Sequence, residues 1–104
     1  VIPLTHELFA NDAIFFTDLR SKKVALKNPA TGYGVEVSYP DFATVAFWTA
    51  AATKAPFLCV EPWNGSAIRS DEDDNFLNRH FLQKLEGGES KGYRVEIKKI
   101  SQQL

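Results

Sequence analysis

The sequence predicts an all-β domain, an antiparallel β-sandwich built from short strands. Several segments of the 104 residues alternate apolar and polar side chains with a period of two, the pattern of a half-buried strand. Turn-forming stretches rich in Gly, Pro, Asn and Asp separate these segments. No internal repeat or linker divides the chain, so we expect one domain over residues 1–104.

The chain begins with one predicted helical turn and a first strand. In LTHELF, residues 4–9, Thr5 can cap the turn, and Leu4 and Leu8 lie at helical spacing. NDAIFFTDL, residues 11–19, is a run rich in Ile and Phe, which favour strands. We therefore expect a helical turn followed by a strand.

Three later segments show the alternation clearly. KKVALK, residues 22–27, places Val24 and Leu26 on one face. YGVEVSY, residues 33–39, carries a Tyr or Val at every second position, and YRVEI, residues 93–97, repeats this pattern near the C-terminus. Each segment is predicted to be a half-buried strand with one apolar face.

TVAFWTAAATK, residues 44–54, is ambiguous. Its alanines favour a helix, whereas Val45, Phe47 and Trp48 favour a strand. We predict a strand over residues 43–49. Trp48 is interpreted as a core residue because apolar residues surround it in the sequence, with a sugar-stacking role as the alternative.

FLCVEPW, residues 57–63, places one carboxylate, Glu61, at the end of the most apolar run of the chain. If residues 57–61 form a strand, both of its faces are largely apolar, which is typical of a central strand. Pro62 lacks an N–H and is expected to end the ladder there. A carboxylate at that position loses hydration and becomes a better proton acceptor if it stays ionised. Glu61 is therefore a candidate general base, and a solvated or ion-paired structural Glu is the alternative.

Three other features in or near this stretch could have a functional or a structural role. Trp63 offers a flat apolar ring with an N–H, the type of side chain that stacks on the C–H face of a sugar. Cys59 has apolar neighbours and is interpreted as a buried small hydrophobe. DEDD, residues 71–74, lacks the ligand spacing of a calcium loop and is interpreted as a solvated acidic loop. We expect no metal ion and no cofactor.

Composition limits the partners. The chain has 12 Lys and Arg against 13 Asp and Glu, so no basic field favours nucleic acid. No apolar run reaches the ~18 residues of a membrane span, so no membrane partner is expected. A single cysteine fits a reducing, cytoplasmic compartment. The chain contains no Met and begins with VIPLT, which predicts that it is processed or is a piece of a longer protein.

CVEPWNG, residues 59–65, is preceded by KAPFL and followed by an acidic loop and LQKLEGGES. This order resembles the C-terminal part of the aldose 1-epimerase (galactose mutarotase-like) family, especially its LacX-like branch, and the earlier blocks VIPLTHELFANDAIFF, KKVAL and FATVAFWT follow in the order of that branch. The resemblance implies that residues 1–104 are the C-terminal part of a large antiparallel β-sandwich. It implies a reaction that interconverts the α and β anomers of a hexose.

The resemblance also implies roles for single residues. Glu61 matches the base that takes the proton from the C1 hydroxyl, and Asp12 resembles the Asp that hydrogen-bonds sugar hydroxyls, with Trp63 as a further sugar-binding candidate. The family's acid is a His that lies upstream of this chain. His6 and His80 stand in no family motif and are interpreted as partly exposed structural histidines.

Two expectations accompany this assignment, and two alternatives to it stay open. The 104-residue chain alone is expected to be inactive, because it supplies a base and no identifiable acid. The alternatives are a hexose-phosphate 1-epimerase, which needs extra Arg or Lys for the phosphate, and a non-catalytic carbohydrate-binding or interaction module. Uncovered strand edges and apolar surface predict self-association of the chain.

Overall fold

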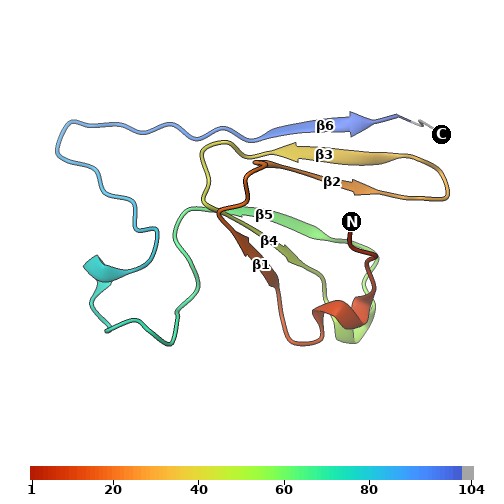
Figure 1. Ribbon diagram of the computed structural model, residues 1–104, viewed down its shortest axis with the longest axis horizontal. Helices are drawn as coiled ribbons and strands as arrows, with labels where there is room; N and C mark the ends of the chain where they lie inside the picture. Colours follow the sequence, from red (N-terminus) through yellow and green to blue (C-terminus); the bar gives the residue numbers. More distant parts are fainter. Residues whose placement is uncertain (102–104) are drawn as a thin grey trace.

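The computed structural model describes residues 1–101 and contains two antiparallel three-stranded sheets (Figure 1). Sheet A has the order β1-β4-β5, and sheet B has the order β2-β3-β6. The strands are β1 (Ile14–Thr17), β2 (Lys23–Lys27), β3 (Gly34–Ser38), β4 (Thr44–Trp48), β5 (Cys59–Trp63) and β6 (Glu96–Ile100). The short 3₁₀ helices are η1 (His6–Phe9), η2 (Ala51–Thr53) and η3 (Phe76–Asn78). The predicted all-β, antiparallel class is confirmed.

The predicted N-terminal turn is present as η1. The Thr5 hydroxyl accepts a hydrogen bond from the Leu8 N–H at 3.3 Å, as expected of an N-cap residue. Phe9 at the end of this turn is buried. Over the described residues no helix is long and apolar enough to cross a membrane.

Sheet B follows the predicted alternation in its first two strands. Val24 pairs with Val37, and Leu26 pairs with Val35, so these four side chains lie on one face. Val37 is buried there. The apolar face predicted for both segments is therefore confirmed.

The third strand of sheet B differs from its prediction. The strand was expected over residues 93–97, but β6 runs from Glu96 to Ile100. The Tyr93 ring instead lies 5.6 Å from the Phe42 ring, and the Arg94 N–H donates to the Asp41 carboxylate at 2.7 Å. These contacts use residues 93–94 outside the ladder. Because β6 is an edge strand, Ile97 is 74% exposed rather than half-buried.

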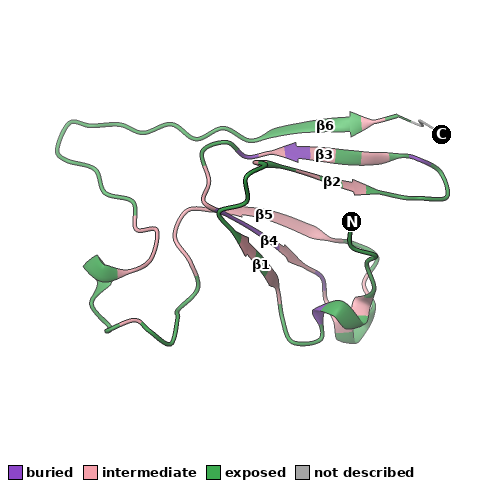
Figure 2. Ribbon diagram, viewed as in Figure 1, coloured by how far each residue is buried: buried purple, intermediate pink, exposed green. Residues whose placement is uncertain are grey.

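In sheet A, β4 lies between two partners and contains the most deeply buried positions of the strands (Figure 2). The strand predicted over residues 43–49 is confirmed, and the alanines that follow it form η2. Thr44, Val45 and Ala46 are fully buried or nearly so.

Strand β5 corrects two predictions. It was expected to be a central strand that ends at Pro62, but it lies at the edge of sheet A and continues to Trp63. An edge strand has one side without ladder bonds, and a proline is tolerated when its missing N–H falls on that side. Pro62 therefore pairs with Val45 without ending the strand. All five residues of β5 are half-buried.

The segment between β5 and β6 extends away from both sheets (Figure 1) and is mostly exposed (Figure 2). Several of its internal contacts are polar. The Arg79 guanidinium donates to the Ser66 carbonyl at 2.9 Å and lies 2.7 Å from the Glu72 carboxylate. Large apolar side chains such as Ile68 and Leu77 remain exposed in this segment.

Candidate functional site

The register of sheet A brings the candidate base and its neighbours onto one face. Ala46 pairs with Phe15 on one side and with Glu61 on the other. Thr44 pairs in the same way with Trp63 on β5. Directly paired residues, and residues two apart along a strand, share a face of the sheet. Phe15, Glu61 and Trp63 therefore lie on the same face, here called the Glu61 face.

Glu61 and Trp63 are joined by a direct hydrogen bond. The Trp63 indole Nε1–H donates to Glu61 Oε2 at 3.1 Å. The two residues alternate with Pro62 on an extended strand, so their side chains project from the same face. The structure thus brings together two of the three residues that the sequence proposed for the site.

Phe15 is a member of the site that the sequence did not single out. Its ring packs against the Trp63 ring with centroids 5.3 Å apart and planes at 88°, an edge-to-face contact. The two rings belong to the outer strands of sheet A and meet over β4. This explains why the small residues between them, Ala46 and Thr44, are 0% and 1% exposed. Phe15 itself is 42% exposed and presents aromatic surface on the Glu61 face.

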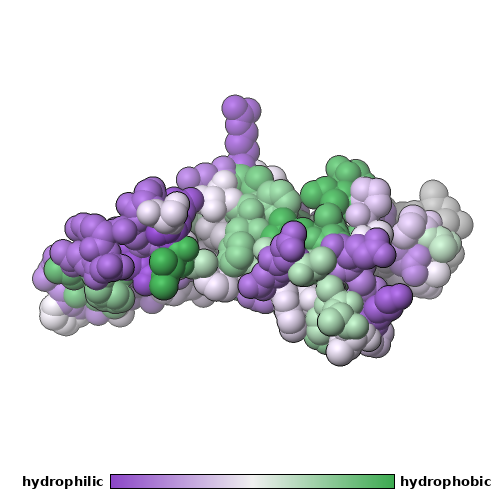
Figure 3. Space-filling model, turned by 90° about the horizontal axis from the view of Figure 1, so that it is seen from below, coloured by the Kyte–Doolittle hydropathy of each residue, from purple (hydrophilic) through white to green (hydrophobic). Residues whose placement is uncertain are grey.

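A third row of the same face contains Trp48 and Cys59, which pair directly. Trp48 was predicted to be a core residue, but it is half-buried on this face, with its ring 5.9 Å from the Phe57 ring. Cys59 was predicted to be buried and is also half-buried. Cys59 lies on the edge strand β5, which has a neighbouring strand on one side only. Seen from below, apolar residues gather over the middle of the molecule, where sheet A lies (Figure 3).

Asp12 lies apart from this group. It precedes β1, is exposed, and has the left-handed backbone angle φ of 92°. Its Oδ1 accepts a hydrogen bond from the Ala13 N–H at 2.7 Å, so the carboxylate closes a local turn. Two strand spacings, about 10 Å, separate β1 from β5. No hydrogen bond links Asp12 with Glu61 within residues 1–101.

Neither histidine contacts Glu61. His6 Nε2 lies 2.8 Å from the Ala55 carbonyl oxygen and His80 Nε2 lies 3.3 Å from an Asp71 carboxylate oxygen. Both side chains are half-buried, in line with the structural interpretation.

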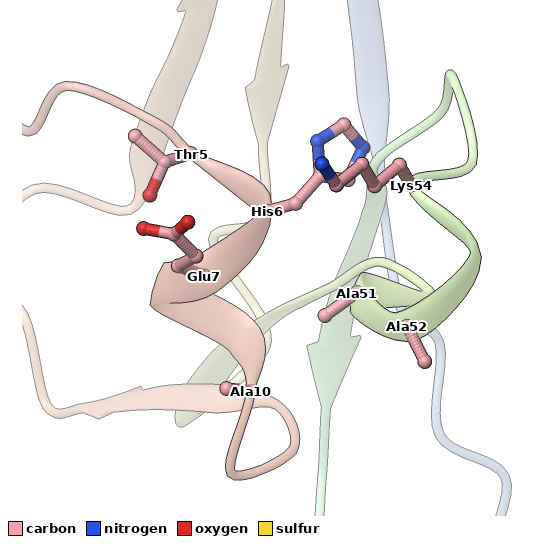
Figure 4. Close-up of a pocket in the computed structure, with 7 residues that line it drawn as sticks. All are labelled: Thr5, His6, Glu7, Ala10, Ala51, Ala52 and Lys54. Carbon is pink, nitrogen blue, oxygen red and sulfur yellow. The ribbon is translucent and has the colours of Figure 1, made fainter.

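The His6 ring lines a separate hollow of about 430 Å³ between η1 and η2 (Figure 4). Thr5, Glu7 and Lys54 contribute its other polar side chains, and three alanines line the rest. It contains no residue of the Glu61 face. This hollow is therefore not the site that the sequence predicted.

The acidic run at residues 71–74 is exposed apart from one carboxylate. Glu72 has a side chain only 5% exposed, and it forms an ion pair with Arg79 without good hydrogen-bond geometry. The Asn78 side-chain amide and the Asn75 backbone N–H both donate to Asp73 and lower its pKa. In residues 1–101 no three His, Cys, Asp or Glu side chains are grouped so that they could hold a metal ion.

Comparison with known proteins gives two relatives, the chromosomal and the plasmid LacX proteins of Lactococcus lactis subsp. lactis. Each is 36% identical to this chain over 76 residues, which are 73% of the chain and 25% of the relative. The match thus spans about a quarter of the length of these relatives. No family model matches the chain. No solved structure matches it significantly.

Proposed function

We propose that Glu61 is the general base of an aldose 1-epimerase-like enzyme that interconverts the α and β anomers of a hexose. The observation that carries this proposal is the carboxylate itself, held by the Trp63 N–H at 3.1 Å on a face that also presents aromatic rings. The motif resemblance around Glu61 and the similarity to the LacX proteins support the family. The names of those relatives state no activity.

In this proposal the reaction needs two proton transfers. Glu61 takes the proton from the C1 hydroxyl as an acid protonates the ring oxygen, and the C1–O5 bond breaks to give the open-chain aldehyde. Rotation about the C1–C2 bond presents the other face of the carbonyl. Ring closure then returns the proton from Glu61 to the new C1 hydroxyl and returns the other proton to the acid.

Within residues 1–101 neither histidine can serve as the acid beside Glu61, because both have contacts elsewhere. We propose that it comes from the remaining three quarters of the relatives' length, and that the isolated 104-residue chain has no measurable mutarotase activity. Polarimetry on the purified chain tests this. Clear turnover of a hexose by the chain alone would show that it contains the acid.

The aromatic rings supply the apolar part of a sugar site. The C–H face of a hexose can lie on Phe15 or on the exposed part of Trp48, while polar groups take its hydroxyls. Strands β1, β4 and β5 contain no Lys or Arg. The hexose-phosphate alternative therefore lacks a phosphate ligand on this sheet, whereas an unphosphorylated hexose needs none.

The test is a substitution of Glu61 by Gln in a protein of the relatives' full length that carries this sequence. Gln keeps the size of the side chain and cannot accept the proton, so kcat should fall about 10²- to 10⁴-fold. Glu36→Gln is the matched control, because Glu36 lies on β3 in sheet B and forms an ion pair with Lys23, away from the Glu61 face. A Glu61→Gln enzyme within a few-fold of wild type would remove Glu61 as the base.

A non-catalytic carbohydrate-binding module is the second candidate, favoured by an aromatic face that carries a carboxylate without a histidine beside it in residues 1–101. The full-length protein distinguishes the two functions. Hexose binding by calorimetry without any mutarotase activity would support the module and would contradict the enzyme.

A further inference from the structure

Only one oxygen of the Glu61 carboxylate is engaged in the protein. Oε2 accepts the indole N–H of Trp63 at 3.1 Å, and Oε1 has no hydrogen-bond partner within residues 1–101. Glu61 is half-buried on an edge strand, so its side chain is not confined by close packing on all sides. The indole N–H is thus the polar contact that fixes the direction of this carboxylate.

The Trp63 ring is in turn held by its own contacts. Phe15 packs edge-to-face against it from β1, and its cross-strand partner Thr44 is fully covered beneath the two rings. An indole has two side-chain torsions and loses little freedom when packed. A chain of contacts therefore runs from Phe15 to Trp63 to Glu61 across the three strands of sheet A.

We infer that Trp63 is a positioning residue, which holds Glu61 Oε2 through its indole N–H and leaves Oε1 as the oxygen that exchanges a proton with the sugar. This inference rests on the proposed role of Glu61 as the base. A hydrogen bond to an ionised carboxylate is stronger than a hydrogen bond between neutral groups, so it can restrain the carboxylate before the substrate binds. A base held in the productive geometry needs no reorganisation when the proton moves.

The hydrogen bond to Glu61 limits the contacts that Trp63 can make with a sugar. Its single N–H donates to Glu61 and is not available to a sugar hydroxyl in this geometry. Trp63 can still offer part of its ring face. Loss of the N–H alone should therefore change the chemical step rather than sugar affinity.

The hydrogen bond can be tested on the 104-residue chain without reference to activity. The chain has two tryptophans, so a ¹⁵N-labelled sample gives two indole N–H signals, assigned with Trp48→Phe and Trp63→Phe. In Glu61→Gln the Trp63 signal should move upfield, because a charged acceptor is replaced by a neutral one, while the Trp48 signal stays within its linewidth. A Trp63 signal that does not respond to Glu61→Gln would overturn the inference.

The positioning role is tested by kinetics in the full-length protein. Trp63→Phe keeps an aromatic ring against Phe15 and removes the N–H, so kcat should fall roughly tenfold with KM within about twofold of wild type. A raised KM with unchanged kcat would identify Trp63 as a sugar-stacking residue and overturn the inference.

If Trp63→Phe does not fold, the Glu61→Gln spectrum still decides whether the hydrogen bond exists. If Glu61→Gln leaves activity intact but shifts the Trp63 signal, the contact stands and the proposed function fails.

Discussion

Substitution of Ala46 by Leu should disrupt the Glu61 face from beneath. Ala46 is 0% exposed and pairs with both Phe15 and Glu61, and the Phe15 and Trp63 rings meet above it at 5.3 Å between centroids. A Leu adds three carbon atoms in a space that holds one methyl group. Overpacking of this kind costs about 1–3 kcal/mol of unfolding free energy, because neighbouring side chains must leave their preferred rotamers.

The assay is thermal unfolding followed by circular dichroism. A loss of about 2 kcal/mol corresponds to a Tm lowered by roughly 8–16 °C for a chain of this size. Ala25→Leu is the matched control, because Ala25 lies on β2 at an exposed position, and its Tm should stay within about 3 °C of wild type. Two equal Tm values for Ala46→Leu and wild type would show that the rings do not close over Ala46.

Two further outcomes follow from particular contacts. Gly34→Ala should lower the unfolding free energy by about 1–3 kcal/mol in denaturant titrations, because a Cβ there would collide with the Leu26 backbone carbonyl, whereas Gly87→Ala meets open space and should be near neutral. Asp73 has a folded-state pKa lowered by the Asn78 amide, so its stabilising contribution is complete above the ordinary value of 3.8 and is lost as pH falls through the lowered value. The Asn78 side-chain amide signals in NMR should shift over that acidic range. If these signals have the same chemical shifts in Asp73→Asn as in wild type at neutral pH, the role of this hydrogen bond is contradicted.

Alternation in the sequence predicted β2 and β3, whereas the β-branched and aromatic composition of the chain predicted β1 and β4. The period of two identifies β2 and β3 because one face of each is covered, and it does not depend on knowing the partner strand. YRVEI at residues 93–97 has the same pattern, yet Tyr93 is used in a contact with Phe42. An alternating pattern shows which side chains share a face, but it does not show where the ladder begins.

The errors at β5 have a different origin. Its residues are apolar on both faces, which local sequence alone assigns to a central strand. Edge or central position depends on which strands are neighbours, and this is a property of the tertiary fold. Pro62 carries the relevant signal, since prolines within sheets are found mainly at edges. That signal was interpreted as the end of the strand.

The site shows the same division between local and non-local information. Glu61 and Trp63 are two residues apart, so a strand is enough to place them side by side. Phe15 joins them only through the register of β1 on β4 and of β4 on β5. The periodicity of the sequence does not predict that register, so the sequence alone did not identify Phe15 as a member of the site.

The edge position of β5 leaves Glu61 less buried than its sequence predicts. The sequence predicts that Glu61 loses hydration at the end of a buried strand, but the carboxylate is half-buried in the middle of an edge strand. Burial is therefore a weaker reason to assign Glu61 as a base than the sequence suggested. What distinguishes Glu61 from a solvated surface carboxylate is its fixed hydrogen bond to Trp63 and the aromatic ring that holds this Trp. Catalysis by an oriented carboxylate requires that restraint, so the Trp63 N–H is the contact whose removal tests the assignment most directly.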